Sequence, residues 1–71
     1  MNSISKRIKE LCEINNISIQ QLADESGVPI STIRSILRTD REMNVRIETI
    51  DNLARGFGIS FVEFMSAEVF K

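Results

Sequence analysis

The sequence predicts a compact all-α domain of five short helices. Apolar residues recur at intervals of three and four along the chain, and no stretch keeps the period of two that a β-strand would show. Helix-start and helix-stop residues divide this pattern into five segments. A chain of 71 residues can enclose only one small core, so we expect a single domain over residues 1–71.

The first predicted helix spans residues 3–15. Its inward positions share one face and are Ile4, Ile8, Leu11 and Cys12. Cys12 is the only cysteine, so it forms no internal disulfide, and we expect it to be a small apolar core residue. The Asn15-Asn16 pair ends this helix.

The second predicted helix, residues 19–26, has a complete start signal. Ser18 at the N-cap and Gln21 three residues later form a capping box, and Ile17 and Leu22 flank them as a hydrophobic staple. Gly27 ends the helix, because glycine readily adopts the left-handed conformation that many helix C-termini require.

The third predicted helix spans residues 29–38. Pro29 suits its first turn, where a backbone N–H would lack a partner, and its buried face is Ile33, Ile36 and Leu37. Only a few residues separate it from the second helix, and Ala23 is small enough for the two helices to cross closely. This spacing is that of a helix-turn-helix over about residues 19–38.

The last part of the chain predicts two further helices. Asn44 is the expected cap of the fourth, and Gly58 is its expected end. Its expected inward residues are Ile47, Ile50, Leu53, Ala54 and Phe57. Ser60 and Glu63 then repeat the capping-box pattern. The fifth helix carries Phe61, Val62, Phe64, Met65 and Val69.

Composition excludes several classes of function. The chain contains no His, Trp or Tyr, its Cys, Asp and Glu lack metal-site spacing, and it has no glycine-rich phosphate loop. We therefore predict no catalytic site, metal or cofactor, and no enzymatic activity. Neither a leader peptide nor an apolar run of membrane-spanning length is present, which predicts a cytoplasmic protein without a membrane partner.

The helix-turn-helix resembles that of the lambda-repressor/Cro-type (XRE-like) family of bacterial and phage transcriptional regulators. The resemblance is carried by Leu22-Ala23, Gly27, Val28, Ile33 and Ile36. The segment NVRIETIDNLARGFGISFVEFM is similar to the family's fourth and fifth helices, so the likeness runs from about Ile4 to Met65. It implies a compact five-helix, lambda-repressor-like DNA-binding domain with a central helix-turn-helix.

The same resemblance implies a recognition helix at residues 29–38 that enters the major groove of double-stranded DNA. Its implied base-facing positions are Ile30, Ser31, Arg34, Ser35 and Arg38. Helical geometry at about 100° per residue agrees, because Ser31, Ser35 and Arg38 lie opposite the inward Ile33. We expect phosphate contacts around the groove from Gln20, Thr39, Arg41, Asn44 and Arg46.

Charge does not contradict a DNA partner, although the net charge of the chain is −1. Residues 29–46 carry four arginines against two acidic residues, so the implied contact region is locally basic.

The resemblance also implies a homodimer whose recognition helices lie one DNA turn apart. The expected interface is on the fifth helix and comprises Phe61, Val62, Met65 and Val69. The alternative is that Val62 and Val69 are singly exposed apolar residues.

Three hypotheses of function follow. The first is a transcriptional regulator, most simply a repressor, bound to its operator as a homodimer. The second is an antitoxin of the same fold, which would also bind a protein partner such as a toxin. The third is a protein-interaction module that has lost DNA binding. A protein partner, such as a toxin or an antirepressor, therefore remains an alternative to double-stranded DNA as the only binding partner.

Overall fold

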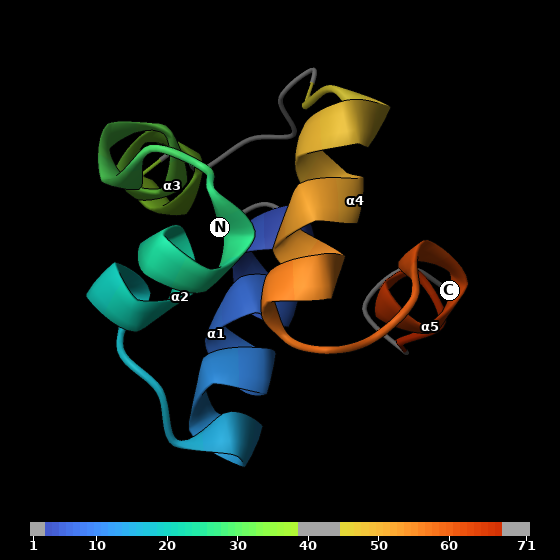
Figure 1. Cartoon of the computed structure of the whole chain (residues 1–71). Helices are drawn as coiled ribbons and strands as arrows, with labels where there is room; N and C mark the ends of the chain where they lie inside the picture. Colours follow the sequence, from blue (N-terminus) through green and yellow to red (C-terminus); the bar gives the residue numbers. More distant parts are fainter. Residues whose placement is uncertain (1–2, 39–44, 68–71) are drawn as a thin grey trace.

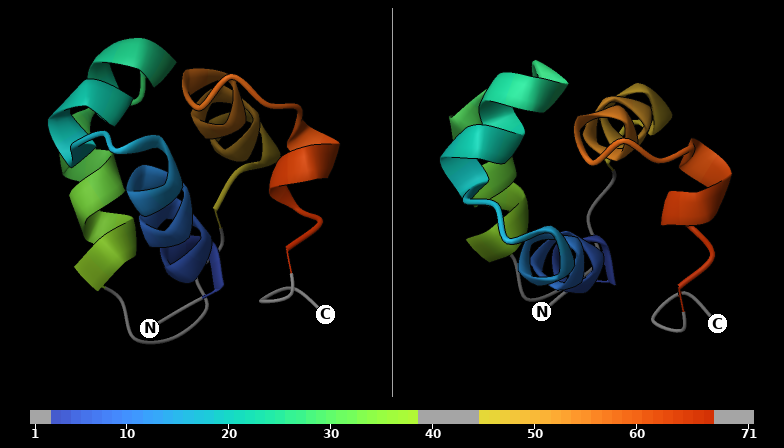
Figure 2. Two further views of the ribbon diagram at one scale, coloured as in Figure 1. Left: turned by 90° about the horizontal axis from the view of Figure 1, so that it is seen from below. Right: turned by 60° about the horizontal axis from the view of Figure 1, so that its bottom comes forward.

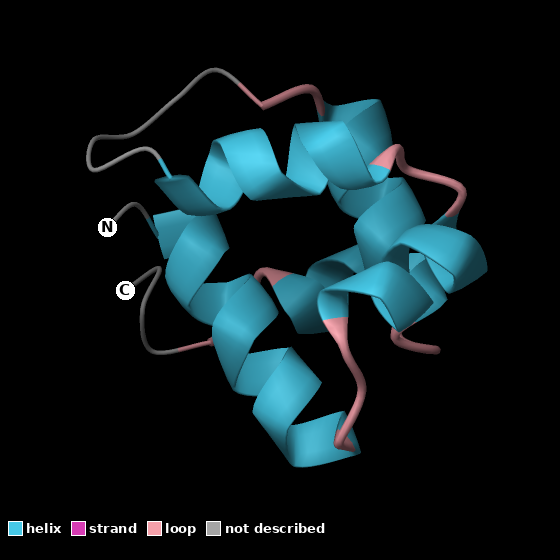
Figure 3. Ribbon diagram, turned by 90° about the vertical axis from the view of Figure 1, so that its left-hand side faces the viewer, coloured by secondary structure: helices cyan, strands magenta, loops and turns pink. Residues whose placement is uncertain are grey.

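Caps at the helix ends define the elements of the fold. The computed structural model describes residues 3–38 and 45–67, and within them all regular structure is helical (Figure 1, Figure 3). The helices are α1 (Ser3–Asn15), α2 (Ile19–Ser26), α3 (Ile30–Arg38), α4 (Ile47–Gly56) and α5 (Phe61–Phe64). The predicted all-α fold of five short helices is confirmed.

The predicted ends of α2 are confirmed. The Ser18 hydroxyl accepts a hydrogen bond from the Gln21 amide at 3.1 Å, and the Gln21 side chain accepts one from the Ser18 amide at 2.8 Å. Gly27 has φ 75°, and its amide donates to the carbonyl oxygen of Ala23 at 3.0 Å. The capping box and the left-handed glycine thus fix both ends of the helix.

The turn between α2 and α3 is anchored by a buried side chain and by backbone caps. Val28 is buried in the core, and its amide donates to the Ser26 hydroxyl at 3.1 Å. The carbonyl oxygen of Pro29 accepts from the Ile33 amide at 3.2 Å. Pro29 therefore stands just before α3, which begins at Ile30, one residue later than the sequence predicts.

The core contains side chains from all five helices. Its buried apolar residues are Ile4, Ile8, Leu11, Leu22, Val28, Ile33, Ile36, Ile50, Leu53, Ala54, Phe57 and Phe64. Cys12 and Leu37 are half-buried and pack against this cluster. Burial raises the pKa of the Cys12 thiol, which favours its neutral form and a packing role.

The start of α4 differs from the prediction in two ways. Arg46 occupies the N-cap, without a side-chain capping bond, whereas the predicted cap Asn44 lies outside the described residues. Ile47 was predicted to face inward but is 72% exposed. Ile47 lies in the first turn of α4, at the opposite end of the helix from the segment that leads to α5 (Figure 1), and the buried residues of this helix begin only at Ile50.

The helix α5 is shorter than the sequence predicts. The Ser60 hydroxyl accepts from the Glu63 amide at 3.0 Å, so the predicted cap is present. The helix ends at Phe64, and Met65, which was expected within the helix, is its C-cap. The Ser66 hydroxyl donates to the Val62 carbonyl at 2.6 Å, a local bond that competes with helix continuation. Val69 itself lies outside the described residues.

The helices form two groups with α1 between them. Figure 2 shows α2 and α3 on one side of the molecule, and α4 and α5 on the other. The end of α4 packs closely on the end of α2, because a Cβ atom added to Gly56 would lie 2.7 Å from the Cβ of Ser26. Gly56 therefore permits an approach between α2 and α4 that any larger residue would obstruct.

Candidate nucleic-acid interface

The face of α3 that points away from the core carries most of the predicted base-facing residues. Ile33 and Ile36 are buried beneath α3, which fixes the rotation of the helix. Of the predicted residues, Ser31, Arg34, Ser35 and Arg38 are exposed, and Ile30 at the start of the helix is half-buried. The structure thus presents these four polar residues to solvent on one helix.

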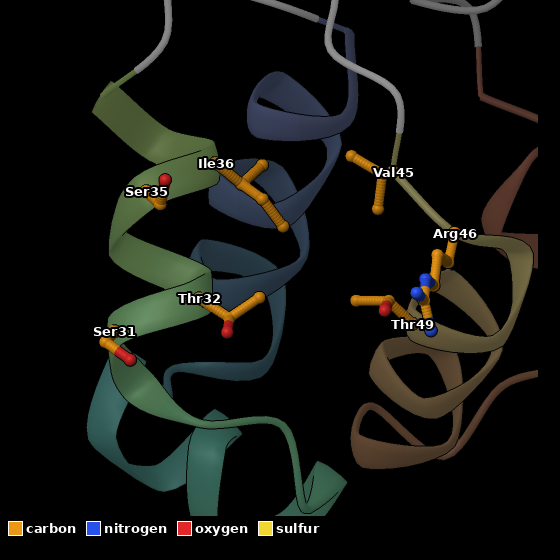
Figure 4. Close-up of a pocket in the computed structure, with 7 residues that line it drawn as sticks. All are labelled: Ser31, Thr32, Ser35, Ile36, Val45, Arg46 and Thr49. Carbon is orange, nitrogen blue, oxygen red and sulfur yellow. The ribbon is translucent and has the colours of Figure 1, made fainter.

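A groove with a volume of about 320 Å³ separates α3 from the start of α4. Its lining residues are Ser31, Thr32, Ser35, Ile36, Val45, Arg46 and Thr49. Thr32 and Ile36 point from α3 toward α4, and Val45 and Thr49 stand on the opposite side (Figure 4). Hydroxyl groups and one guanidinium therefore surround an aliphatic surface, a combination that can hydrogen-bond to phosphates and base edges.

Sequence reasoning missed Thr32 and Thr49. Both threonines line the groove, although neither belongs to the predicted contact set. Thr32 and Arg34 flank the inward Ile33 on opposite sides of α3. Which of these two sides meets α4 depends on the tertiary arrangement, so the periodicity of α3 contains no signal for it. The position of Thr49 in the groove likewise depends on the tertiary arrangement of α3 and α4.

The predicted phosphate contacts are only partly described. Arg46 is exposed at the N-cap of α4 and lines the groove. Gln20 is exposed on α2, and its amide donates to the Asp24 carboxylate at 3.2 Å, which places a negative charge beside it. Thr39, Arg41 and Asn44 lie outside the described residues.

The exposed arginines of α3 and of the start of α4 are available to an anionic ligand. In the part of the chain that the structure describes, no carboxylate pairs with Arg34, Arg38 or Arg46. The Nε atom of Arg38 donates to the carbonyl oxygen of Arg34 at 3.4 Å, a long bond within α3. Arg55, at the other end of α4, instead pairs with Asp51 at 3.2 Å. Of the three uncompensated guanidinium groups, that of Arg46 lines the groove, and those of Arg34 and Arg38 stand on the exposed surface of α3.

The predicted dimer residues do not share one environment. Phe61 and Met65 are half-buried and pack against the core beside Phe64. Val62 is 72% exposed. Among the predicted dimer residues that the structure describes, Val62 is therefore the one that is open to contact with a second chain.

The described residues contain neither a membrane-spanning helix nor a cluster of metal ligands. No helix there is both long and apolar enough to cross a membrane. Within residues 3–38 and 45–67, no group of three or more His, Cys, Asp or Glu side chains is placed to hold a metal ion.

The fold and the groove define a helix-turn-helix protein, and comparison with protein families agrees. A family model described as helix-turn-helix matches residues 8–64, well over half of the chain. The chain therefore belongs to the lambda-repressor/Cro-type helix-turn-helix family of DNA-binding transcriptional regulators, and the resemblance in the sequence is confirmed. The match includes all of α2 and α3. Neither curated proteins nor solved structures give a significant match.

Proposed function

We propose that this regulator is a repressor that binds a near-palindromic operator as a homodimer, with α3 of each copy in the major groove. The observation that supports the proposal is the exposed strip of α3, whose two arginines have no carboxylate partner among the described residues. A desolvated guanidinium needs acceptors, and guanine edges and phosphates supply them.

Each residue of the strip has a chemical role in this proposal. Arg34 and Arg38 donate to the O6 and N7 atoms of guanine, a bidentate contact that distinguishes guanine from other bases. The hydroxyl groups of Ser31 and Ser35 donate to or accept from neighbouring base edges. Ile30, at the start of α3, contacts the methyl group of thymine.

The residues around the groove position the protein on the DNA backbone. Arg46 binds a phosphate beside the groove, and Gln20 binds another from α2. Thr32 and Thr49 add hydroxyl donors on the two walls of the groove. The same role is predicted for Thr39, Arg41 and Asn44. These contacts set affinity and register, whereas the strip on α3 sets sequence preference.

Selection from random duplexes, followed by titration of the enriched sequence by fluorescence anisotropy, tests this proposal. We expect Arg34→Ala and Arg38→Ala each to weaken operator binding by about 1–3 kcal/mol. Arg55→Ala is the matched control, because it removes an exposed arginine from the far end of α4. Failure to enrich any sequence, with all three variants binding like the parent, would reject the repressor and favour a protein-interaction module.

Homodimerisation is the second part of the proposal. One short helix covers too few base pairs to select a site among about 10⁶ or more genomic competitors. We propose that two copies meet through the surface of Phe61, Val62, Met65 and Val69, with Val62 as its exposed apolar contact. Phe61 and Met65 contribute only their uncovered parts, because both also pack against the core.

Sedimentation of the parent and of Val62→Glu, with and without operator, tests the dimer. We expect a weak dimer in solution that the operator stabilises and that Val62→Glu disrupts. Ile14→Glu is the control, because Ile14 is comparably exposed, at 70%, near the end of α1. One chain per operator, or equal behaviour of the two variants, would exclude this interface.

An antitoxin is the second candidate, and the exposed Ile14 supports it. The last turn of α1 lies at the opposite end of the molecule from the start of α4, so Ile14 is remote from the proposed DNA contact (Figure 1). An exposed apolar residue there is open to a protein partner. Co-expression with the product of the adjacent gene tests this candidate. A complex that Ile14→Glu disrupts would favour the antitoxin.

A further inference from the structure

The side chain of Arg7 joins α1 to the end of α5. Its Nε donates to the carbonyl oxygen of Phe64 at 2.8 Å, and its Nη2 donates to that of Glu63 at 2.9 Å. Its Nη1 donates to the Glu10 carboxylate at 2.6 Å. The side chain is 11% exposed, and its guanidinium carbon lies 5.8 Å from the centre of the Phe64 ring. A nearly buried charge is thus matched by three acceptors.

The helix α5 needs a contact of this kind because it has only four residues. A helix so short is not stable by itself, and its last carbonyl groups lack intrahelical donors. Arg7 donates to the Phe64 carbonyl and adds a second donor to the Glu63 carbonyl, which also accepts from the Ser66 amide at 3.2 Å, and a cation is favourable at a helix C-terminus. The buried Phe64 ring fixes where α5 lies, and Arg7 fixes the direction of the turn that carries Val62.

We infer that Arg7 is a positioning residue for the surface through which two copies pair. The inference rests on the proposed dimer, in which Val62 is the exposed contact. Arg7 acts from behind that surface, because its own donors are used within the chain. Without the guanidinium, the α5 turn shifts or opens. The apparent dimer affinity then falls with the fraction of chains whose surface is in place.

Four variants separate the carbonyl contacts of Arg7 from its charge. Arg7→Met keeps an unbranched apolar stem beside Phe64 and removes every donor. Arg7→Lys keeps the charge but replaces the planar fork by one ammonium group. Glu10→Gln removes the ion pair and leaves both carbonyl contacts. Lys9→Met removes an exposed cation from the same helix and serves as the control.

Sedimentation equilibrium of these variants gives the first measurement. We expect Arg7→Met to weaken the dimer about threefold or more, since affinity follows the competent fraction. Arg7→Lys should fall between Arg7→Met and the parent, because a single ammonium nitrogen keeps the charge but does not reproduce the separate Nε and Nη2 donors. Glu10→Gln and Lys9→Met should match the parent. A dimer that Arg7→Met leaves unchanged overturns the inference.

Hydrogen exchange in a Val62→Glu background gives the second measurement, independent of pairing. Adding Arg7→Met should speed exchange of the Phe64 and Met65 amides by about tenfold, since charged hydrogen bonds restrain the turn. Exchange in α4 should change less, which separates a local effect from global unfolding. Unchanged α5 exchange overturns a positioning role. If Val62→Glu leaves the parent dimer intact, the proposed dimer surface fails and the pairing role of Arg7 fails with it.

Discussion

The two sides of the molecule use arginine in opposite ways. Beside α5, Arg7 is nearly buried, and its guanidinium donates to two carbonyl oxygens and one carboxylate. On α3 and at the start of α4, Arg34, Arg38 and Arg46 are exposed and lack a carboxylate partner within the described ranges. An arginine whose donors are satisfied inside the chain stabilises the fold, whereas one whose donors face solvent is available to a ligand. Residue type alone does not distinguish the two roles.

The largest expected effect tests this contrast through stability. Arg7→Met should lower the free energy of unfolding by about 2–3 kcal/mol, because hydrogen bonds from charged donors contribute about 1.5–3 kcal/mol. Arg34→Met should change it by no more than about 0.5 kcal/mol, as expected of an exposed surface residue. Urea unfolding followed by circular dichroism, at one low protein concentration, measures both.

Glu10→Gln is the matched control for Arg7→Met. Its carboxylate is half exposed, so loss of the ion pair alone should cost little. Equal losses of stability in Arg7→Met and Arg34→Met would contradict the contrast between the two sides.

The close contact between α2 and α4 gives the next prediction. Gly56→Ala should lower the free energy of unfolding by about 1–3 kcal/mol, because its Cβ would meet Ser26 and overpack the contact. The same change should weaken operator binding, since α2 packs on both α3 and α4, which form the two walls of the groove. Both effects are measured on one preparation, by urea unfolding and by anisotropy.

A double-mutant cycle identifies the cause of that loss. Ser26→Gly removes the atom nearest to the new methyl group, so it should partly offset Gly56→Ala and make the pair non-additive. Gly58→Ala is the control, because Gly58 has φ 76° and open space around it. Its cost should come from backbone strain and should add independently to that of Ser26→Gly. Additive behaviour in both cycles would reject the steric explanation.

Local chemistry was sufficient to predict most of the fold. Ser18, Gln21 and Gly27 act through bonds to residues within four positions, so their roles can be recognised in the sequence. The buried face of α3 likewise follows from its own periodicity. Ile47 was predicted wrongly, because its burial depends on which other segments cover it. The periodicity of apolar residues after Ser60 also gave no sign that α5 ends at Phe64.

The site was predictable in part for the same reason. The outward strip of α3 follows from the rotation of one helix. The groove requires α4 to lie on the Thr32 side of α3, and the bond from Arg7 to Phe64 joins positions 57 apart in the chain. No periodic pattern encodes such contacts. The close approach of Gly56 to Ser26, where an added Cβ atom would lie 2.7 Å from the Ser26 Cβ, is likewise a contact between α4 and α2 that no local pattern indicates.

Arg46 allows a test of the groove side alone. Arg46→Gln should weaken binding to all duplexes alike and reduce the slope of log affinity against log salt by about one unit, as expected when one phosphate contact is lost. Arg34→Gln should instead change the preferred sequence. Anisotropy titrations at several salt concentrations separate the two outcomes. An unchanged slope in Arg46→Gln, together with altered sequence preference, would assign Arg46 to base recognition instead.

The smallest effects are expected at the two serine caps, one on each side of the molecule. Ser18 caps α2 through both bonds of a capping box, and Ser60 caps α5 through the bond from the Glu63 amide. We expect Ser18→Ala to lower the free energy of unfolding by about 1 kcal/mol and Ser60→Ala by about 0.5 kcal/mol. The expected cost at Ser60 is lower because its cap stabilises a helix of only four residues, and because Arg7 already binds the other end of that helix. Ser18→Asp and Ser60→Asp are the controls, since an aspartate retains the cap and suits a helix N-terminus.

In an Arg7→Met background, Ser60→Ala should cost more than in the parent, whereas Ser18→Ala should cost the same. Equal costs of Ser60→Ala in the two backgrounds would mean that the two ends of α5 are held independently.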